Sequence, residues 1–132
     1  MQRAKHINLC SLAVFMFLIA GPLVHAASPR PFDANAFQTA QELGKPILVE
    51  ISADWCPNCR AQRPIPEKIS SESKYSNVTR FRVDFDIDKS AVKEFKVRFL
   101  STLVVFKGKA EVARSAGELD ETKIRSMLNK AL

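Results

Sequence analysis

Histidine is almost missing from this chain. Its 132 residues include two histidines, His6 and His25, and both lie within the first 26 residues. Residues 27–132 therefore hold no imidazole that could act as a general base or bind a metal. This excludes a hydrolase of the Cys-His type, and it excludes a Cys2His2 zinc site built by one chain.

Cysteine is nearly as scarce, with three residues in the whole chain. Cys10 lies in an apolar segment and follows Leu9, where a lipidated cysteine would follow a small residue, so we interpret Cys10 as inert. The other two, Cys56 and Cys59, are three positions apart. Since no further cysteine or histidine accompanies them after residue 26, we expect them to act as a pair.

The chain also lacks clustered charge. Its 20 Lys and Arg and its 14 Asp and Glu are interspersed, and the basic residues do not gather around aromatic ones. Scattered charge of this kind is typical of a solvated surface, so we expect no nucleic-acid partner. The chain has no internal repeats or low-complexity tracts, and its length leaves room for one domain.

The first 26 residues contain no acidic side chain. Two basic residues precede an apolar run at 9–24, which ends at the small residue Ala26. This pattern is typical of a secretory signal peptide. It predicts a signal peptide at 1–26 and a folded domain at 27–132, with cleavage after Ala27 as a close alternative.

An uncleaved anchor is the alternative interpretation of the same segment. An apolar run of about 16 residues falls only slightly short of the roughly 17–25 residues that span a bilayer. Under either interpretation the domain lies outside the cytoplasm. We therefore expect a periplasmic or secreted protein, with a membrane-anchored form as the alternative.

The rest of the chain alternates between helical and strand patterns. Apolar residues recur at helical spacing after Asp33, Asp88 and Asp120, which are suited to cap helices. The run at 47–51 is almost continuously apolar, as in a strand covered on both faces. We expect helices from Asp33 to Leu43, from Cys59 to about Ser73 with a kink at Pro64 and Pro66, from Asp88 through Phe95 and from Asp120 through Ala131, and strands at 47–51, 81–85, 102–106 and 110–115.

This order predicts an α/β fold. Alternating helices and strands, followed by two consecutive strands and a helix, imply a central mixed β-sheet flanked by helices on both faces, with a C-terminal β-hairpin plus helix. Residues 28–32 show neither pattern, and we expect them to be a loose lead-in. A chain of this size can bury about two-thirds of its unfolded surface, so we expect an independently folded monomer.

The cysteine pair lies at the predicted junction between a strand and a helix. At that junction the first sulfur can sit at the helix N-terminus, where the helix dipole and unpaired amides stabilise a thiolate. We therefore expect Cys56 to be the nucleophile and Cys59, one turn further, to attack the resulting mixed disulfide. The spacing alone leaves a purely structural disulfide or a metal site as alternatives.

Residues 47–56 resemble the strand that leads into the Trp-Cys-x-x-Cys site of the thioredoxin family. The resemblance extends over residues 32–132, where it includes Pro64, Asp84-Phe85-Asp86, the segment 97–107 and Gly117. It implies the thioredoxin fold and thiol–disulfide exchange. It also implies a redox-active disulfide between Cys56 and Cys59, with no other cofactor and no metal.

The same resemblance implies roles for further residues. Glu50 stands where the family usually has a buried aspartate that shuttles protons for the inner cysteine, whereas its alternatives are exposure to solvent or a pair with Arg82. Trp55 is expected to shield the sulfurs, with ordinary packing as the alternative. The substrate-binding residues implied by the resemblance are Trp55, Pro57, Asn58, Leu100, Ser101 and Thr102.

Ser101 is the main departure from the family. It replaces a proline that follows a cis peptide bond, faces the disulfide and hinders capture of metals by the cysteines. A cis bond before a residue other than proline costs about 2.5–4 kcal/mol. The sequence leaves open whether the bond before Ser101 is cis or trans.

Two functions follow. The first is a disulfide reductase or isomerase that acts on exported cysteine-containing proteins and takes electrons from a membrane or soluble donor. The second is a binding module with low turnover, in which the pair holds a metal, an iron–sulfur cluster or a partner protein because of Ser101. Pro57 and Asn58 match none of the commonest pairs between such cysteines, so the direction of electron flow is not predicted.

Overall fold

A computed structural model describes residues 28–132 of the chain. A five-stranded mixed sheet with strand order β1-β3-β2-β4-β5 forms its centre. The signal peptide predicted at 1–26 lies outside the described residues and stays a prediction. Along the chain the elements are β1 (Arg30–Pro31), α1 (Ala34–Glu42), β2 (Pro46–Ser52), α2 (Pro57–Gln62), α3 (Pro64–Ser70), the 3-10 helix η1 (Ser73–Tyr75), β3 (Thr79–Asp84), α4 (Lys89–Glu94), β4 (Thr102–Lys107), β5 (Ala110–Ala116) and α5 (Glu121–Asn129).

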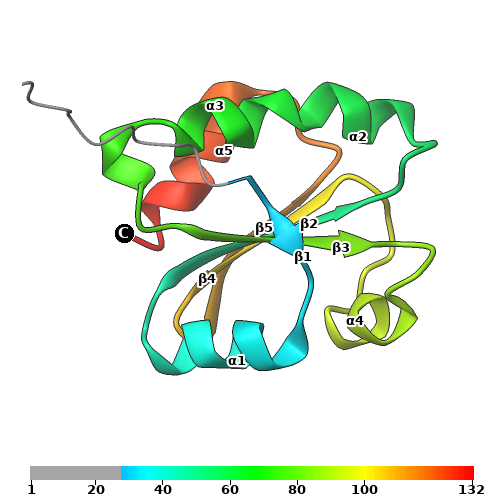
Figure 1. The fold of residues 1–132 in the computed structure, drawn as a ribbon. Coiled ribbons are helices and arrows are strands. Elements are labelled where there is room, and N and C mark those ends of the chain that lie inside the picture. The colour runs from blue at the N-terminus through cyan, green and yellow to red at the C-terminus, as the bar shows by residue number, and fades with distance from the viewer. Residues whose placement is uncertain (1–27) are drawn as a thin grey trace, which may run out of the picture.

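Helices cover both faces of the sheet, which confirms the predicted fold class. Helices α1 and α4 lie on one face, and α2, α3 and α5 lie on the other (Figure 1). The side chains of β2 alternate between the two faces, since Ile47, Val49 and Ile51 pack toward α1 and α4 while Leu48 packs toward α3 and α5. Within residues 28–132 no helix is long and apolar enough to cross a membrane.

The predicted helix after Cys59 is divided in two. Helix α2 ends at Gln62, and α3 begins at Pro64, whose missing N–H interrupts the hydrogen bonds between turns. The predicted kink is therefore confirmed at Pro64, whereas Pro66 lies within the first turn of α3. The outcome is a short helix α2 of six residues, with Cys56 as its N-cap and Cys59 and Gln62 on its buried face.

The prediction of a loose lead-in at 28–32 is wrong. Arg30 and Pro31 form a short strand that runs parallel to β3, opposite Phe81 and Arg82. The amide of Phe32 donates a hydrogen bond to the carbonyl oxygen of Arg82 at 2.9 Å. Proline is tolerated here because β1 is an edge strand, and one side of it needs no donor.

Strand pairing brings four chain segments to one end of the sheet. Strands β2 and β3 run parallel and both end there, at Ser52 and Asp84. Strand β4 is antiparallel to β2, so its first residue, Thr102, lies at the same end, opposite Ala116 at the end of β5. The segments that follow or precede these residues form the surroundings of the cysteine pair.

The core beneath α1 and α4 is rich in phenylalanine, and Phe37 lies at its centre. Its ring centroid lies 5.8, 5.3 and 5.3 Å from those of Phe81, Phe95 and Phe106, each in an edge-on arrangement. Its side chain is 5% exposed. Edge-to-face contacts of this kind add to the free energy of apolar burial.

Replacement of this ring tests the packing. We expect Phe37→Ala to lower the free energy of unfolding by about 3–5 kcal/mol, because the change leaves a cavity in the core. Denaturant unfolding followed by circular dichroism measures it. Phe99, which is 68% exposed, provides the matched control: Phe99→Ala should change stability by no more than about 0.5 kcal/mol. Equal losses in the two variants would contradict this account of the core.

Candidate active site

Cys56 and Cys59 are joined by a disulfide at the start of α2. Cys56 is the N-cap residue of the helix, and its Sγ accepts a hydrogen bond from the backbone amide of Cys59 at 3.2 Å. Both side chains are buried, at 4% and 3% exposure. Pro57 occupies the first helical position, where its missing N–H costs nothing. The geometry therefore gives the Cys56 sulfur a backbone donor suited to a thiolate.

The loop before β4 packs directly against the disulfide. The Ser101 hydroxyl donates a hydrogen bond to Cys59 Sγ at 3.1 Å, and its oxygen lies 3.6 Å from Cys56 Sγ. No cis peptide bond occurs within residues 28–132, so the bond before Ser101 is trans, and Ser101 itself adopts a positive φ of 56°. The hydroxyl of Thr102 donates to the Phe99 carbonyl oxygen at 2.6 Å within the same loop.

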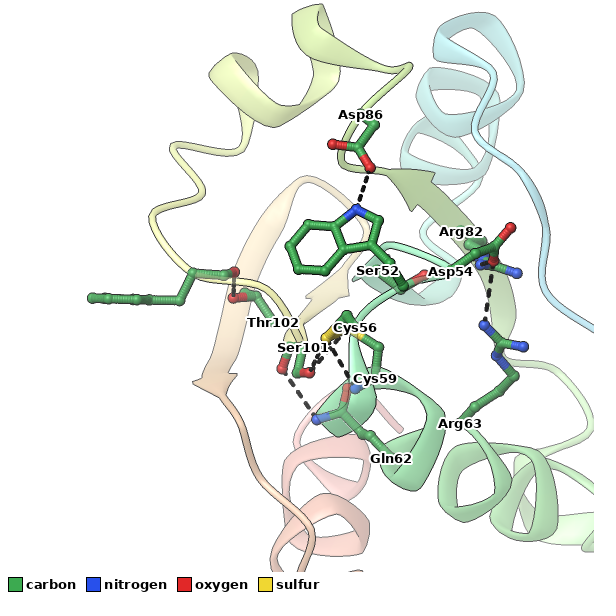
Figure 2. The surroundings of a disulfide bond; sticks show 12 residues. Ser52, Asp54, Cys56, Cys59, Gln62, Arg63, Arg82, Asp86, Ser101 and Thr102 are labelled. Atoms are coloured by element: carbon green, nitrogen blue, oxygen red, sulfur yellow. Dashed lines mark hydrogen bonds and ion pairs between the residues drawn. A yellow bond between two sulfur atoms is a disulfide. The ribbon is translucent and has the colours of Figure 1, made fainter.

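Gln62 lies beside this loop and is not among the site residues expected from the sequence. Its side chain is 5% exposed, and its Nε2 donates a hydrogen bond to the carbonyl oxygen of Ser101 at 3.1 Å (Figure 2). The same nitrogen donates to the carbonyl oxygen of Glu118 at 2.8 Å. Gln62 is three residues after Cys59 and so lies on the same face of α2. A glutamine on a buried helix face next to the cysteine pair was the signal that could have indicated it.

Glu50 is buried on the face of the sheet that carries α2 and α3. Its exposure is 7%, and its carboxylate accepts a hydrogen bond from Nε of the fully buried Arg80 at 2.7 Å. The alternatives of solvent exposure and a pair with Arg82 do not describe it, because Arg82 instead contacts Ser52 and Asp54. Burial raises the pKa of Glu50 above its ordinary value of 4.5, although the hydrogen bond from Arg80 acts in the opposite direction.

A small cavity connects this carboxyl with the inner cysteine. Its volume is about 20 Å³, and Glu50, Cys59, Gln62 and Arg63 are among the residues that line it. A space of this size and polarity can hold about one water molecule. Glu50 and Cys59 therefore line one space with room for a water molecule.

Trp55 lies at the rim of the site and is 62% exposed, so ordinary packing does not account for it. Its indole Nε1 donates a hydrogen bond to Asp86 Oδ2 at 2.7 Å, which ties the ring to the segment that follows β3. Of the other residues proposed to bind substrate, Pro57 is exposed, Asn58 and Leu100 are half-buried, and Ser101 and Thr102 are buried. These roles stay predictions.

Residues 28–132 contain no group of three or more His, Cys, Asp or Glu side chains that could hold a metal ion. A two-cysteine site would therefore need ligands from a second molecule to bind an iron–sulfur cluster, which takes four.

Comparison with known proteins agrees with this geometry. The sequence model of the thioredoxin family matches residues 29–130. The chain is 28% identical to a thioredoxin of Synechocystis sp. over 107 residues, which cover 81% of this chain and 99% of that protein. It is 33% identical over 85 residues to a bifunctional thioredoxin reductase/thioredoxin of Mycobacterium leprae, of which it spans 18%.

A solved structure gives the same result. The crystal structure of Trxlp from Edwardsiella tarda superposes with a TM-score of 0.73 at 35% identity, and the match covers 76% of this chain and 98% of that one. The order of the elements, the position of the disulfide and these matches agree. The chain belongs to the thioredoxin family of disulfide oxidoreductases, and Cys56 and Cys59 form its disulfide.

Proposed function

We propose that this protein exchanges dithiol and disulfide with exported protein substrates, with Cys56 as the nucleophile and Cys59 as the resolving cysteine. The observation that carries the proposal is the disulfide at the start of α2, with Cys56 at the helix cap and Cys59 beside the cavity that Glu50 lines. The signal-peptide pattern at 1–26 supports an exported location, periplasmic or secreted. We further propose that the protein acts as a monomer and that a membrane or soluble electron donor reduces its Cys56–Cys59 disulfide after each cycle.

The reductive reaction takes two steps. The Cys56 thiolate attacks one sulfur of the substrate disulfide, that bond breaks, and the released substrate thiolate takes up a proton. Cys59 then loses its proton through water to Glu50 and attacks Cys56 Sγ. The mixed disulfide breaks, the second substrate thiolate leaves, and the two electrons of the dithiol have passed to the substrate.

Four exposed apolar side chains lie on segments at the same end of the sheet as the disulfide, which supports a protein substrate. Trp55, Ile87, Phe99 and Leu119 are 62%, 78%, 68% and 44% exposed. They belong to the segments that follow β2 and β3, precede β4 and follow β5, and all four segments meet at one end of the sheet. Apolar groups gathered in this way are typical of a surface that binds another protein.

The cysteine assignment is tested by single substitutions. We expect Cys56→Ser to abolish reduction of insulin, whereas Cys59→Ser should still attack and should accumulate mixed disulfides with periplasmic extracts. Non-reducing electrophoresis followed by mass spectrometry identifies the trapped partners. Trapping through Cys59 in the Cys56→Ser variant would reverse the assignment. A parent protein that does not reduce insulin, but carries iron after anaerobic purification, would support the binding module instead.

The apolar rim is tested at Phe99. We expect Phe99→Ala to raise KM for insulin about fivefold or more, because a buried aromatic contact at an interface contributes about 1 kcal/mol or more. The reaction with oxidised glutathione, which is too small to cover the rim, should keep its rate. Leu43, which is 66% exposed at the end of α1, is the control: Leu43→Ala should change neither reaction. Equal slowing of both substrates by Phe99→Ala would argue against a docking surface.

Glu50 is tested through the second step. We expect Glu50→Gln to slow resolution by Cys59 about tenfold or more, while attack by Cys56 changes little, because only the inner cysteine shares a cavity with the carboxyl. Single-turnover kinetics with a trapped mixed disulfide separate the steps. Equal slowing of both steps would remove this role.

Protonation of Glu50 adds a second test. Because its pKa is raised in the folded state, the native protein binds this proton more tightly than the unfolded chain. The free energy of unfolding should therefore fall as pH rises from 4.5 through the raised pKa. Denaturant titrations across this range should show that decline in the parent, and it should be absent in Glu50→Gln. A parent whose stability rises instead would show that the ion pair with Arg80 dominates over burial.

A further inference from the structure

The Ser101 hydroxyl contacts both sulfur atoms of the disulfide. It lies 3.1 Å from Cys59 Sγ as a donor and 3.6 Å from Cys56 Sγ, and the residue is 1% exposed. A disulfide sulfur is a weak acceptor, but a thiolate is a strong one, because hydrogen bonds to ionised acceptors are about twice as strong as neutral ones. This contact therefore strengthens when the disulfide opens.

The backbone of Ser101 adopts an unfavourable conformation. Ser101 has a φ of 56°, a left-handed conformation that a residue with a Cβ atom rarely adopts. Its carbonyl oxygen accepts hydrogen bonds from Gln62 Nε2 at 3.1 Å and from the Gly117 amide at 2.9 Å. Two donors from separate segments thus fix one carbonyl group, and strain of this kind persists where the surroundings over-determine the backbone.

We propose that Ser101 is a catalytic residue of disulfide exchange, whose hydroxyl donates to Cys59 Sγ as that sulfur becomes a thiolate, and that Gln62 is the positioning residue that holds the hydroxyl there. This inference rests on the proposed function and adds a determinant of its redox equilibrium. It assigns a role to the serine that replaces the family's proline, and to a buried amide that no other part of the reaction uses.

Glutathione reduces the Cys56–Cys59 disulfide in two steps. A glutathione thiolate attacks Cys56 Sγ, the Cys56–Cys59 bond breaks, and a mixed disulfide forms while Cys59 leaves with the electron pair. The Ser101 hydroxyl donates to that departing sulfur. A second glutathione thiolate attacks the glutathione sulfur of the mixed disulfide, which releases oxidised glutathione and the Cys56 thiolate. The hydrogen bond stabilises the open form, in which Cys59 is a thiolate, more than it stabilises the disulfide, so it makes the protein a stronger oxidant.

The test is the equilibrium of the Cys56–Cys59 pair with reduced and oxidised glutathione. Loss of the hydroxyl in Ser101→Ala should shift this equilibrium about tenfold toward the disulfide, which corresponds to a reduction potential lower by about 30 mV. In the reduced protein, the ultraviolet absorbance of the thiolates should appear at higher pH. Ser70 provides the matched control, because it is a buried serine in α3 whose hydroxyl has no hydrogen-bond partner among the described residues. Ser70→Ala should leave the equilibrium unchanged.

A second variant separates the hydroxyl from the backbone. Ser101→Gly also removes the hydroxyl but accepts the positive φ without strain. It should be more stable than Ser101→Ala and should show the same tenfold shift. Unchanged equilibria in both variants, with the parent exchanging normally, would overturn the role of Ser101 and leave the proposed function standing. A parent that neither equilibrates with glutathione nor reduces insulin would overturn both.

Gln62 is tested by a double-mutant cycle. Gln62→Met keeps the length of the side chain but removes the donor, and it should shift the equilibrium in the same direction as Ser101→Ala. If Gln62 acts through Ser101, Gln62→Met combined with Ser101→Ala should shift it no further than Ser101→Ala alone. Additive shifts, or a loss of stability in Gln62→Met without any change in equilibrium, would show that Gln62 is a structural residue only.

Discussion

The carbonyl oxygen of Ser101 is the acceptor on which the arrangement of the site depends. Donors from the end of α2 and from the turn after β5 meet on it, through Gln62 and Gly117. Gln62 also reaches the Glu118 carbonyl with the same nitrogen. Three segments that are distant in sequence are thereby fixed around one disulfide. A buried backbone or amide group that loses its hydrogen-bond partner destabilises the fold. Movement of any one of the three segments would leave such groups unpaired, so each segment holds the other two in place.

The fold was largely predictable because its signals are local. The strands and helices follow from apolar periodicity, caps and the proline at position 64, and these act within a few residues of the chain. Strand β1 was not predictable, since two residues that include Pro31 carry no strand pattern. The strand forms because it pairs with β3, some 50 positions further along the chain. The local sequence of either segment does not predict such a contact.

The site divides along the same line. The cysteine pair, the buried acid and the departure at Ser101 could be identified from spacing and family resemblance. The partner of Glu50 could not. Arg80 and Arg82 point to the same face of β3, and the register places Arg82 directly opposite Glu50. Ser52 and Asp54 accept hydrogen bonds from Arg82 instead. The Glu50 carboxylate therefore pairs with Arg80. Competition among neighbours decides such pairs, and periodicity does not contain that information.

In the proposed docking of a protein substrate, the hydrogen bond between the Trp55 indole and Asp86 would also affect association. A large aromatic side chain that is free at a surface loses rotamer freedom when a partner covers it, and that loss opposes association. Here the segment after β3 already holds the ring in one orientation at 2.7 Å. The side-chain entropy of the indole is therefore lost during folding and not during association. A substrate docking on this rim would therefore meet an indole whose orientation is already set.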